Sequence, residues 1–175
     1  MPATTSSRAR TVSTDALRQR LEGSRRALLE AVRGLSEQAF ASELLPSAAE
    51  RATDSGPTTV VAYLAALAPA EREAVRQARN AVGAEQRPLP PVTAREQVLP
   101  PQLIHDLAGA RYETLLFLDT LTADTLAEKA LTADVLADLQ LRPESGAPSV
   151  QELLEAVAER ESTAAVRVTE RPADG

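Results

Sequence analysis

Apolar side chains recur every three or four residues along four stretches of this chain, and this spacing restricts the fold more than any other feature. The stretches cover about residues 14–34, 58–83, 101–121 and 150–168. Such spacing places the apolar side chains on one face of a helix, and that face must be buried against another element. No segment shows a convincing strand pattern. The sequence therefore predicts an all-α fold, a four-helix bundle.

Capping residues stand where these helices are expected to begin. A Ser, Thr, Asp or Asn side chain before a helix accepts a hydrogen bond from a free amide of the first turn. Glu152, three residues after Ser149, would complete a capping box. The candidate caps are Ser13 or Thr14, Ser36 before a short helical turn, Thr58 or Thr59, and Ser149.

Prolines predict a bend and the main connection. Pro69 lies inside the second helix and should bend it near Ala65, because proline removes one backbone donor. Residues 86–101 contain five prolines and suit a long, semi-rigid connection. The pattern Leu-Thr-Ala-Asp-x-Leu-Ala occurs at Leu121 and again at Leu131, and each copy predicts a short helix with a capping threonine.

The length of 175 residues suits one domain. We expect a single helical-bundle domain over residues 14–168, a disordered tail over 1–13 and a frayed tail over 169–175. Two Phe, two Tyr and no Trp leave the core to Leu, Ala and Val, which favours packed helices over a sheet.

The charge balance and the donor content exclude several functions. A net charge of −6 with dispersed arginines argues against nucleic acid or an anionic membrane as a partner. No apolar run is long enough for a membrane span and no signal peptide is visible, so we expect a cytoplasmic protein. One histidine and no cysteine leave too few donors for a transition metal, and no cofactor is expected.

Three charged residues fall on the apolar faces of their helices. They are Glu71, Arg111 and Glu161. An unpaired buried charge costs several kcal/mol, so the three are expected to form a buried ion network. The network has two interpretations: a bridge that fixes the register of the helices, or the floor of a pocket in which Arg111 holds an anionic ligand. Paired carboxylates could also do acid–base work or bind a hard cation such as Mg²⁺.

Tyr63 is a further candidate for a ligand site, because its hydroxyl could enter a cleft. Tyr112 is the other tyrosine of the chain. His105 lies at the edge of the third apolar stripe, where a lone histidine is usually a surface or boundary residue.

Three segments resemble the DinB-like (DinB/YfiT) superfamily over roughly Thr14 to Val168. PTTVVAYLAALAPAER is similar to its second helix, in which Trp-Ser leads into His-Leu and then Glu-Arg. Here Thr58-Thr59 occupy the position of Trp-Ser, and Ala66-Leu67 occupy the position of His-Leu. Glu71-Arg72 match the Glu-Arg pair. PPQLIHDLAGARYETLLFLDTL resembles the third helix, and SVQELLEAVAERESTAAV resembles the fourth, which carries an HxxxH pair in the family.

The resemblance implies a bundle of up-down-down-up topology whose long crossover joins helices 2 and 3. Many members bind a divalent metal through three histidines, and characterised ones include thiol-dependent transferases and isomerases. Ala66, Arg160 and Ala164 occupy those three positions here. We therefore expect no metal at this site, even though the fold is kept.

The leading functional hypothesis is a metal-free module that binds a small molecule or a protein, with Glu71, Arg111, Glu161 and Tyr63 as the candidate ligand-binding residues. One alternative is a metal- or thiol-dependent transferase or hydrolase that uses carboxylate ligands. Another is a purely structural homodimer. A homodimer is expected in any case, because alanine-rich surfaces on helices 2 and 3 would permit close approach.

Overall fold

The computed structural model describes residues 13–44, 58–90, 98–128 and 147–170. Most of these residues are helical, which confirms the predicted all-α class. The exception is a sheet of two short strands, β1 (Glu43–Leu44) and β2 (Thr58–Thr59), which pair antiparallel with Glu43 opposite Thr59. The expectation of no strand was wrong here, because two residues are too few to show an alternating pattern.

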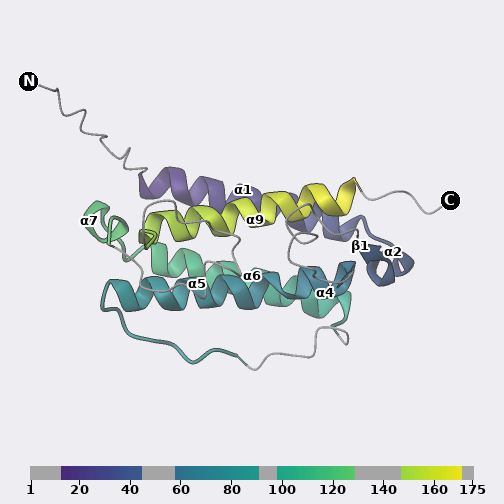
Figure 1. Cartoon of the computed structure of the whole chain (residues 1–175), viewed down its shortest axis with the longest axis horizontal. Coiled ribbons are helices and arrows are strands. Elements are labelled where there is room, and N and C mark those ends of the chain that lie inside the picture. Colours follow the sequence, from purple (N-terminus) through teal and green to yellow (C-terminus); the bar gives the residue numbers. More distant parts are fainter. Residues whose placement is uncertain (1–12, 45–57, 91–97, 129–146, 171–175) are drawn as a thin grey trace, which may run out of the picture.

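Four long helices make up the body of the structure: α1 (Thr14–Arg33), α5 (Leu67–Ala81), α6 (Pro100–Leu118) and α9 (Val150–Thr169). Helix α1 packs mainly against α9 and also contacts α6, while α5 contacts α6 and α9. In Figure 1 the α1/α9 pair lies above the α5/α6 pair. Helices α5 and α6 run in the direction opposite to α1, and α9 runs in the same direction as α1 (Figure 1).

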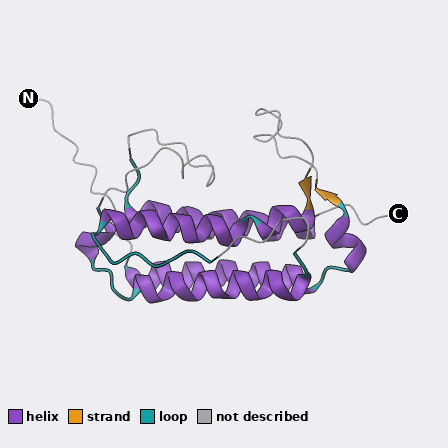
Figure 2. Cartoon of the chain, turned by 90° about the horizontal axis from the view of Figure 1, so that it is seen from below, coloured by secondary structure: helices purple, strands orange, loops and turns teal. Residues whose placement is uncertain are grey.

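Three short helices complete the described elements: α2 (Glu37–Ala41), α4 (Val60–Ala65) and α7 (Ala123–Leu126). The two strands lie beside α2 and α4 at one end of the long helices (Figures 1 and 2). The amide of Val60 donates to the carbonyl of Ser42 at 3.0 Å, so the start of α4 is tied to the end of α2.

The predicted caps are confirmed. Ser13 accepts from the amide of Ala16 and Ser36 from that of Ala39, each at 3.2 Å. Of the two threonine candidates, Thr59 is the cap of α4. Ser149 and Glu152 form the predicted capping box at the start of α9, with hydrogen bonds of 3.2 and 2.6 Å. In the first copy of the sequence repeat, Thr122 caps α7.

The second helix of the sequence prediction is divided in two at Ala66, where α4 ends and α5 follows. Pro69 explains the position of the break. A proline has no amide hydrogen to donate to the carbonyl four residues earlier, and here that carbonyl belongs to Ala65. The sequence predicted a bend near Ala65, and the structure has an interruption at the next residue, where one helix ends and another begins.

Two apolar clusters fill the space between the long helices. One contains residues from α1, α5, α6 and α9, including Leu21, Ala78, Phe117 and Leu154. The other lies nearer the end of the long helices where α2 and α4 are found, and it includes Leu28, Leu67, Leu107 and Ala164. On every long helix the buried charged residue comes between the two sets. The core is therefore split by a polar layer.

Several predictions fall on residues outside the described ranges: the tail over 1–13 except Ser13, the end of the tail over 169–175, and the second copy of the repeat at Leu131. The connection from α5 to α6 is described only at residues 82–90 and 98–99. In the part of the chain that the structure describes, no helix is long and apolar enough to cross a membrane.

Candidate functional site

Four buried charged side chains, one from each long helix, meet in the polar layer. They are Arg25 of α1, Glu71 of α5, Arg111 of α6 and Glu161 of α9, each no more than 5% exposed. Arg111 donates from Nε to Glu71 Oε1 at 2.8 Å and from Nη2 to Glu161 Oε2 at 2.7 Å. Arg25 Nη2 donates to Glu71 Oε2 and Glu161 Oε1. The four side chains form a closed set of ion pairs, called the ion ring below.

Neutral groups complete the surroundings of the ion ring. The Thr114 hydroxyl lies 2.6 Å from Glu71 Oε1, and the Ser24 hydroxyl lies 3.0 Å from Glu161 Oε2. Arg111 also donates from Nη1 to the backbone carbonyl of Leu21. Buried charges are stable only when paired and hydrogen-bonded, and both carboxylates of this ring are.

Burial raises the pKa of the Glu161 carboxyl above its ordinary value, and the neighbouring Arg111 and Arg25 only partly oppose this effect. Desolvation disfavours the charged form of an acid, while nearby cations favour it. The carboxylate of Glu161 is therefore held at some electrostatic cost despite its two arginine partners.

The sequence predicted the inward positions of Glu71, Arg111 and Glu161, and the structure brings these three together. It missed Arg25. The signal was present, because Arg25 lies four residues after Leu21 and three before Leu28, both fully buried on the same face of α1. With a second arginine the ion ring is neutral, whereas the predicted trio carried a surplus negative charge.

The fourth predicted ligand residue, Tyr63, does not join the ion ring. It is half-buried on α4, and the guanidinium of Arg167 stacks over its ring at 4.6 Å from the ring centre. Tyr112 is 65% exposed on α6, and His105 is exposed on the same helix. Among the described residues, none of the three forms a hydrogen bond or ion pair with a carboxylate of the ion ring, so the structure gives them no shared site.

The three positions that the resemblance aligns with metal-binding histidines hold side chains without suitable donors. Ala66 lies between α4 and α5, Ala164 is fully buried in the second apolar cluster, and Arg160 is half-buried on α9. Within residues 13–44, 58–90, 98–128 and 147–170, no three His, Cys, Asp or Glu side chains are grouped so that they could hold a metal ion. An alanine offers no ligand atom, and an arginine stays protonated in proteins.

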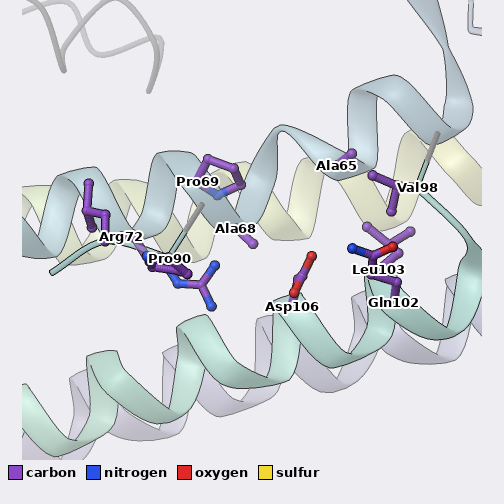
Figure 3. A pocket seen from close by; sticks show the side chains of 10 residues that line it. Ala65, Ala68, Pro69, Arg72, Pro90, Val98, Gln102, Leu103 and Asp106 are labelled. Atoms are coloured by element: carbon purple, nitrogen blue, oxygen red, sulfur yellow. The ribbon is translucent and has the colours of Figure 1, made fainter. Parts of the chain in front are cut away.

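A cavity of about 310 Å³ lies between α4, α5 and α6, on the side where the described parts of the connection from α5 to α6 approach the helices (Figure 3). Most of its wall is apolar. The lining side chains that carry polar groups are Arg72 of α5 and Gln102 and Asp106 of α6. The apolar lining residues are Ala65, Ala68, Pro69, Leu89, Pro90, Val98 and Leu103.

Arg72 has hydrogen-bonding capacity left at this cavity. Its side chain is 13% exposed, and its Nε lies 3.6 Å from Glu113 Oε2, an ion-pair distance that is too long for a hydrogen bond. Nε is buried and has no hydrogen-bond partner among the described residues. The Asp106 side chain points from α6 toward α5 (Figure 3), so the cavity offers a cation and a carboxylate from facing helices.

Comparisons with protein-family models, with curated proteins and with solved structures find no match to this chain. The functional argument therefore rests on the geometry of the two sites, the ion ring and the α5–α6 cavity.

Proposed function

We propose that this chain is a DinB-like four-helix bundle of up-down-down-up topology that has lost the family's metal centre and binds a small molecule. The directions of α1, α5, α6 and α9 support this topology. Helices α5 and α6 run the same way, so the end of α5 and the start of α6 lie at opposite ends of the bundle, as a long crossover requires. The side chains at positions 66, 160 and 164 support the loss of the metal centre.

The α5–α6 cavity carries the proposal of ligand binding. Small-molecule sites are commonly cavities of about 300–1,000 Å³ with mainly apolar walls and a few polar groups. This cavity, at about 310 Å³, has that composition and lies at the lower end of the range. We therefore expect a small, mostly apolar ligand with an acceptor group, since the guanidinium of Arg72 lines the cavity and is a hydrogen-bond donor.

The ion ring supports this location of the ligand rather than one at Glu71 and Glu161. Each carboxylate already binds two guanidinium groups. A ligand or a hard cation would have to displace an arginine and leave it buried without its partner, which is costly. The ring is therefore proposed as a brace that fixes the register of the helices, and the same pairing weakens the alternative of a metal enzyme with carboxylate ligands.

The test is calorimetric titration of the full chain with 2-naphthoate, an apolar molecule with a single carboxylate. We expect saturable binding at one site, weakened by Arg72→Leu and abolished by Ala68→Phe, which fills the cavity. The matched control is Ala16→Phe, at an exposed position of α1. Absence of saturable binding up to about 1 mM, or equal binding by the Ala68→Phe and Ala16→Phe variants, would overturn the proposal.

A homodimer is proposed as the assembly state. The specific observation is on α6, where Tyr112 is 65% exposed and Leu116 36% exposed one turn apart. Ala108 precedes them by one turn and is also exposed. A second copy of the chain would bury this face around a two-fold axis, as in most soluble homo-oligomers.

A further inference from the structure

A second cavity, of about 280 Å³, lies between α1 and α6. It is separate from the α5–α6 cavity and shares no lining residue with it. Its lining residues are Glu22, Arg25, Arg26, Leu29, Arg33 and Arg111. All but Arg111 belong to α1, and their spacing of three and four residues places them on one face of that helix.

The charges that line this cavity leave a positive surplus. Arg25 and Arg111 are balanced by the two carboxylates of the ion ring. Glu22 lies 3.6 Å from Arg18, but Arg18 also binds Asp119, so these two carboxylates share one cation. Arg26 and Arg33 have no ion-pair partner among the described residues, and both are exposed. With Glu22 counted against them, the lining side chains leave a surplus of one positive charge at the mouth of the cavity.

Arg25, one of the lining residues, has unused donors. Its side chain is 6% exposed, and its Nη2 serves both carboxylates of the ion ring. Its Nε and Nη1 are buried and have no hydrogen-bond partner among the described residues. A buried donor of a charged group without an acceptor is costly, so an acceptor oxygen in the cavity would be bound favourably.

We propose that this cavity binds a small oxyanion with two negative charges, of the phosphate monoester class. The buried N–H groups of Arg25 would donate to its oxygens, and Arg26 and Arg33 would close over it from the surface. The exposed guanidinium groups of Arg26 and Arg33 can each pair with one charge of a dianion, whereas a carboxylate carries a single charge. Leu29 is the single apolar residue of the wall, which separates this ligand class from the mostly apolar one proposed for the α5–α6 cavity.

Phenyl phosphate is the probe, and calorimetry of the full chain at about pH 7.5 and low salt is the measurement. We expect binding at one site. The double variant Arg26→Gln/Arg33→Gln should weaken it at least about tenfold, equivalent to about 1.4 kcal/mol. Both residues are exposed, so the variant should fold, whereas a variant of Arg25 would also break the ion ring. Affinity should fall as the pH drops through about 6, where the ligand takes up a proton and the arginines do not.

The matched control removes the same two charges from exposed positions outside the cavity: Arg20→Gln on α1 together with Arg87→Gln. It should keep nearly the affinity of the parent chain. The proposal fails if the two double variants bind alike, if acetate binds as well as phenyl phosphate, or if phenyl phosphate shows no saturable binding up to about 1 mM.

Discussion

Arg25 and Arg111 share the same two carboxylate partners, although they lie on different helices and 86 positions apart in the sequence. Each guanidinium binds Glu71 and Glu161 at once. Removing either arginine therefore leaves two carboxylates for a single cation. Removing either glutamate leaves two guanidinium groups for a single carboxylate.

Loss of one arginine of the ion ring should strongly destabilise the fold. Breaking a buried pair from one side typically costs about 3–5 kcal/mol, a large part of the roughly 5–15 kcal/mol that stabilises a domain. We expect this cost for Arg25→Leu and for Arg111→Leu, measured by urea unfolding.

The control for these variants is Arg26→Leu, an exposed neighbour on α1 whose loss should change stability by no more than about 0.5 kcal/mol. Equal stability of all three leucine variants would show that the ion ring contributes nothing.

Removing an arginine and a glutamate together should cost less than the sum of the two single changes. Arg111→Met with Glu161→Leu leaves the neutral pair Arg25 and Glu71. We expect the double variant to fall short of additivity by about 0.5–3 kcal/mol, the range found for residues in one network. The exposed pair Arg20 and Glu159, 3.1 Å apart, should couple by about 0.2–1 kcal/mol in the same cycle. Strict additivity for the buried pair would contradict the proposed brace.

Stability should depend on pH through Glu161. Its pKa is raised in the folded state, so between 4.5 and the raised pKa the folded chain binds more protons than the unfolded chain. The corresponding stabilisation is complete below the unfolded pKa and is lost as the pH rises through the folded one. We expect the stability advantage of the parent over Glu161→Gln to shrink as the pH rises from 4.5.

Glu73 provides the opposite sign as a control. A hydrogen bond from Arg76 lowers the pKa of this carboxyl, so its contribution is present above 4.5 and is lost as the pH falls. The advantage of the parent over Glu73→Gln should therefore grow with pH. Urea unfolding at several pH values measures both, and parallel curves for the two variants would refute the assignment.

Two glycines should respond in opposite ways to alanine. Gly23 lies inside α1, and no atom would lie within 4 Å of an added Cβ. Gly23→Ala should stabilise by about 0.5–1 kcal/mol, because alanine loses less backbone entropy in a helix. Gly83 has φ +67° after α5, where a Cβ is strained, so Gly83→Ala should destabilise by about 1 kcal/mol. Thermal unfolding that shows the same sign for both would refute this prediction.

The α6 surface should determine the oligomeric state. Light scattering at roughly tens of micromolar should report a dimer for the parent chain. Tyr112→Glu should give a monomer, because it places a charge in the middle of the exposed apolar face. Gln19→Glu adds a charge at an exposed position of α1 and should leave the dimer intact. A monomeric parent would exclude this interface.

Local signals predicted much of the fold. The caps Ser13 and Ser149 and the break at Ala66 depend on residues within one turn, and a sequence shows these directly. The inward positions of Glu71, Arg111 and Glu161 followed from helical spacing alone. Their partner Arg25 satisfies the same spacing rule. Its burial could have been predicted by checking each charged residue of α1 against the apolar face of that helix.

The cavities could not be predicted in this way. The wall of the α5–α6 cavity combines Ala68 of α5 with Leu103 of α6, and the cavity between α1 and α6 combines Arg33 of α1 with Arg111 of α6. Which residues of two helices share a space depends on their separation and rotation. The separation and rotation of two helices are set by packing over the whole core, and the sequence of a single segment does not determine them.

The order of the ion ring along the chain has a consequence for synthesis. A ribosome adds Arg25 first, then Glu71 and Arg111, and Glu161 last, 136 positions after Arg25. Until α9 has left the ribosome, two arginines share one carboxylate, and a nascent chain that buried them would carry an uncompensated positive charge. The first three long helices are thereby discouraged from closing prematurely, and the last helix completes the charge balance and the apolar core together.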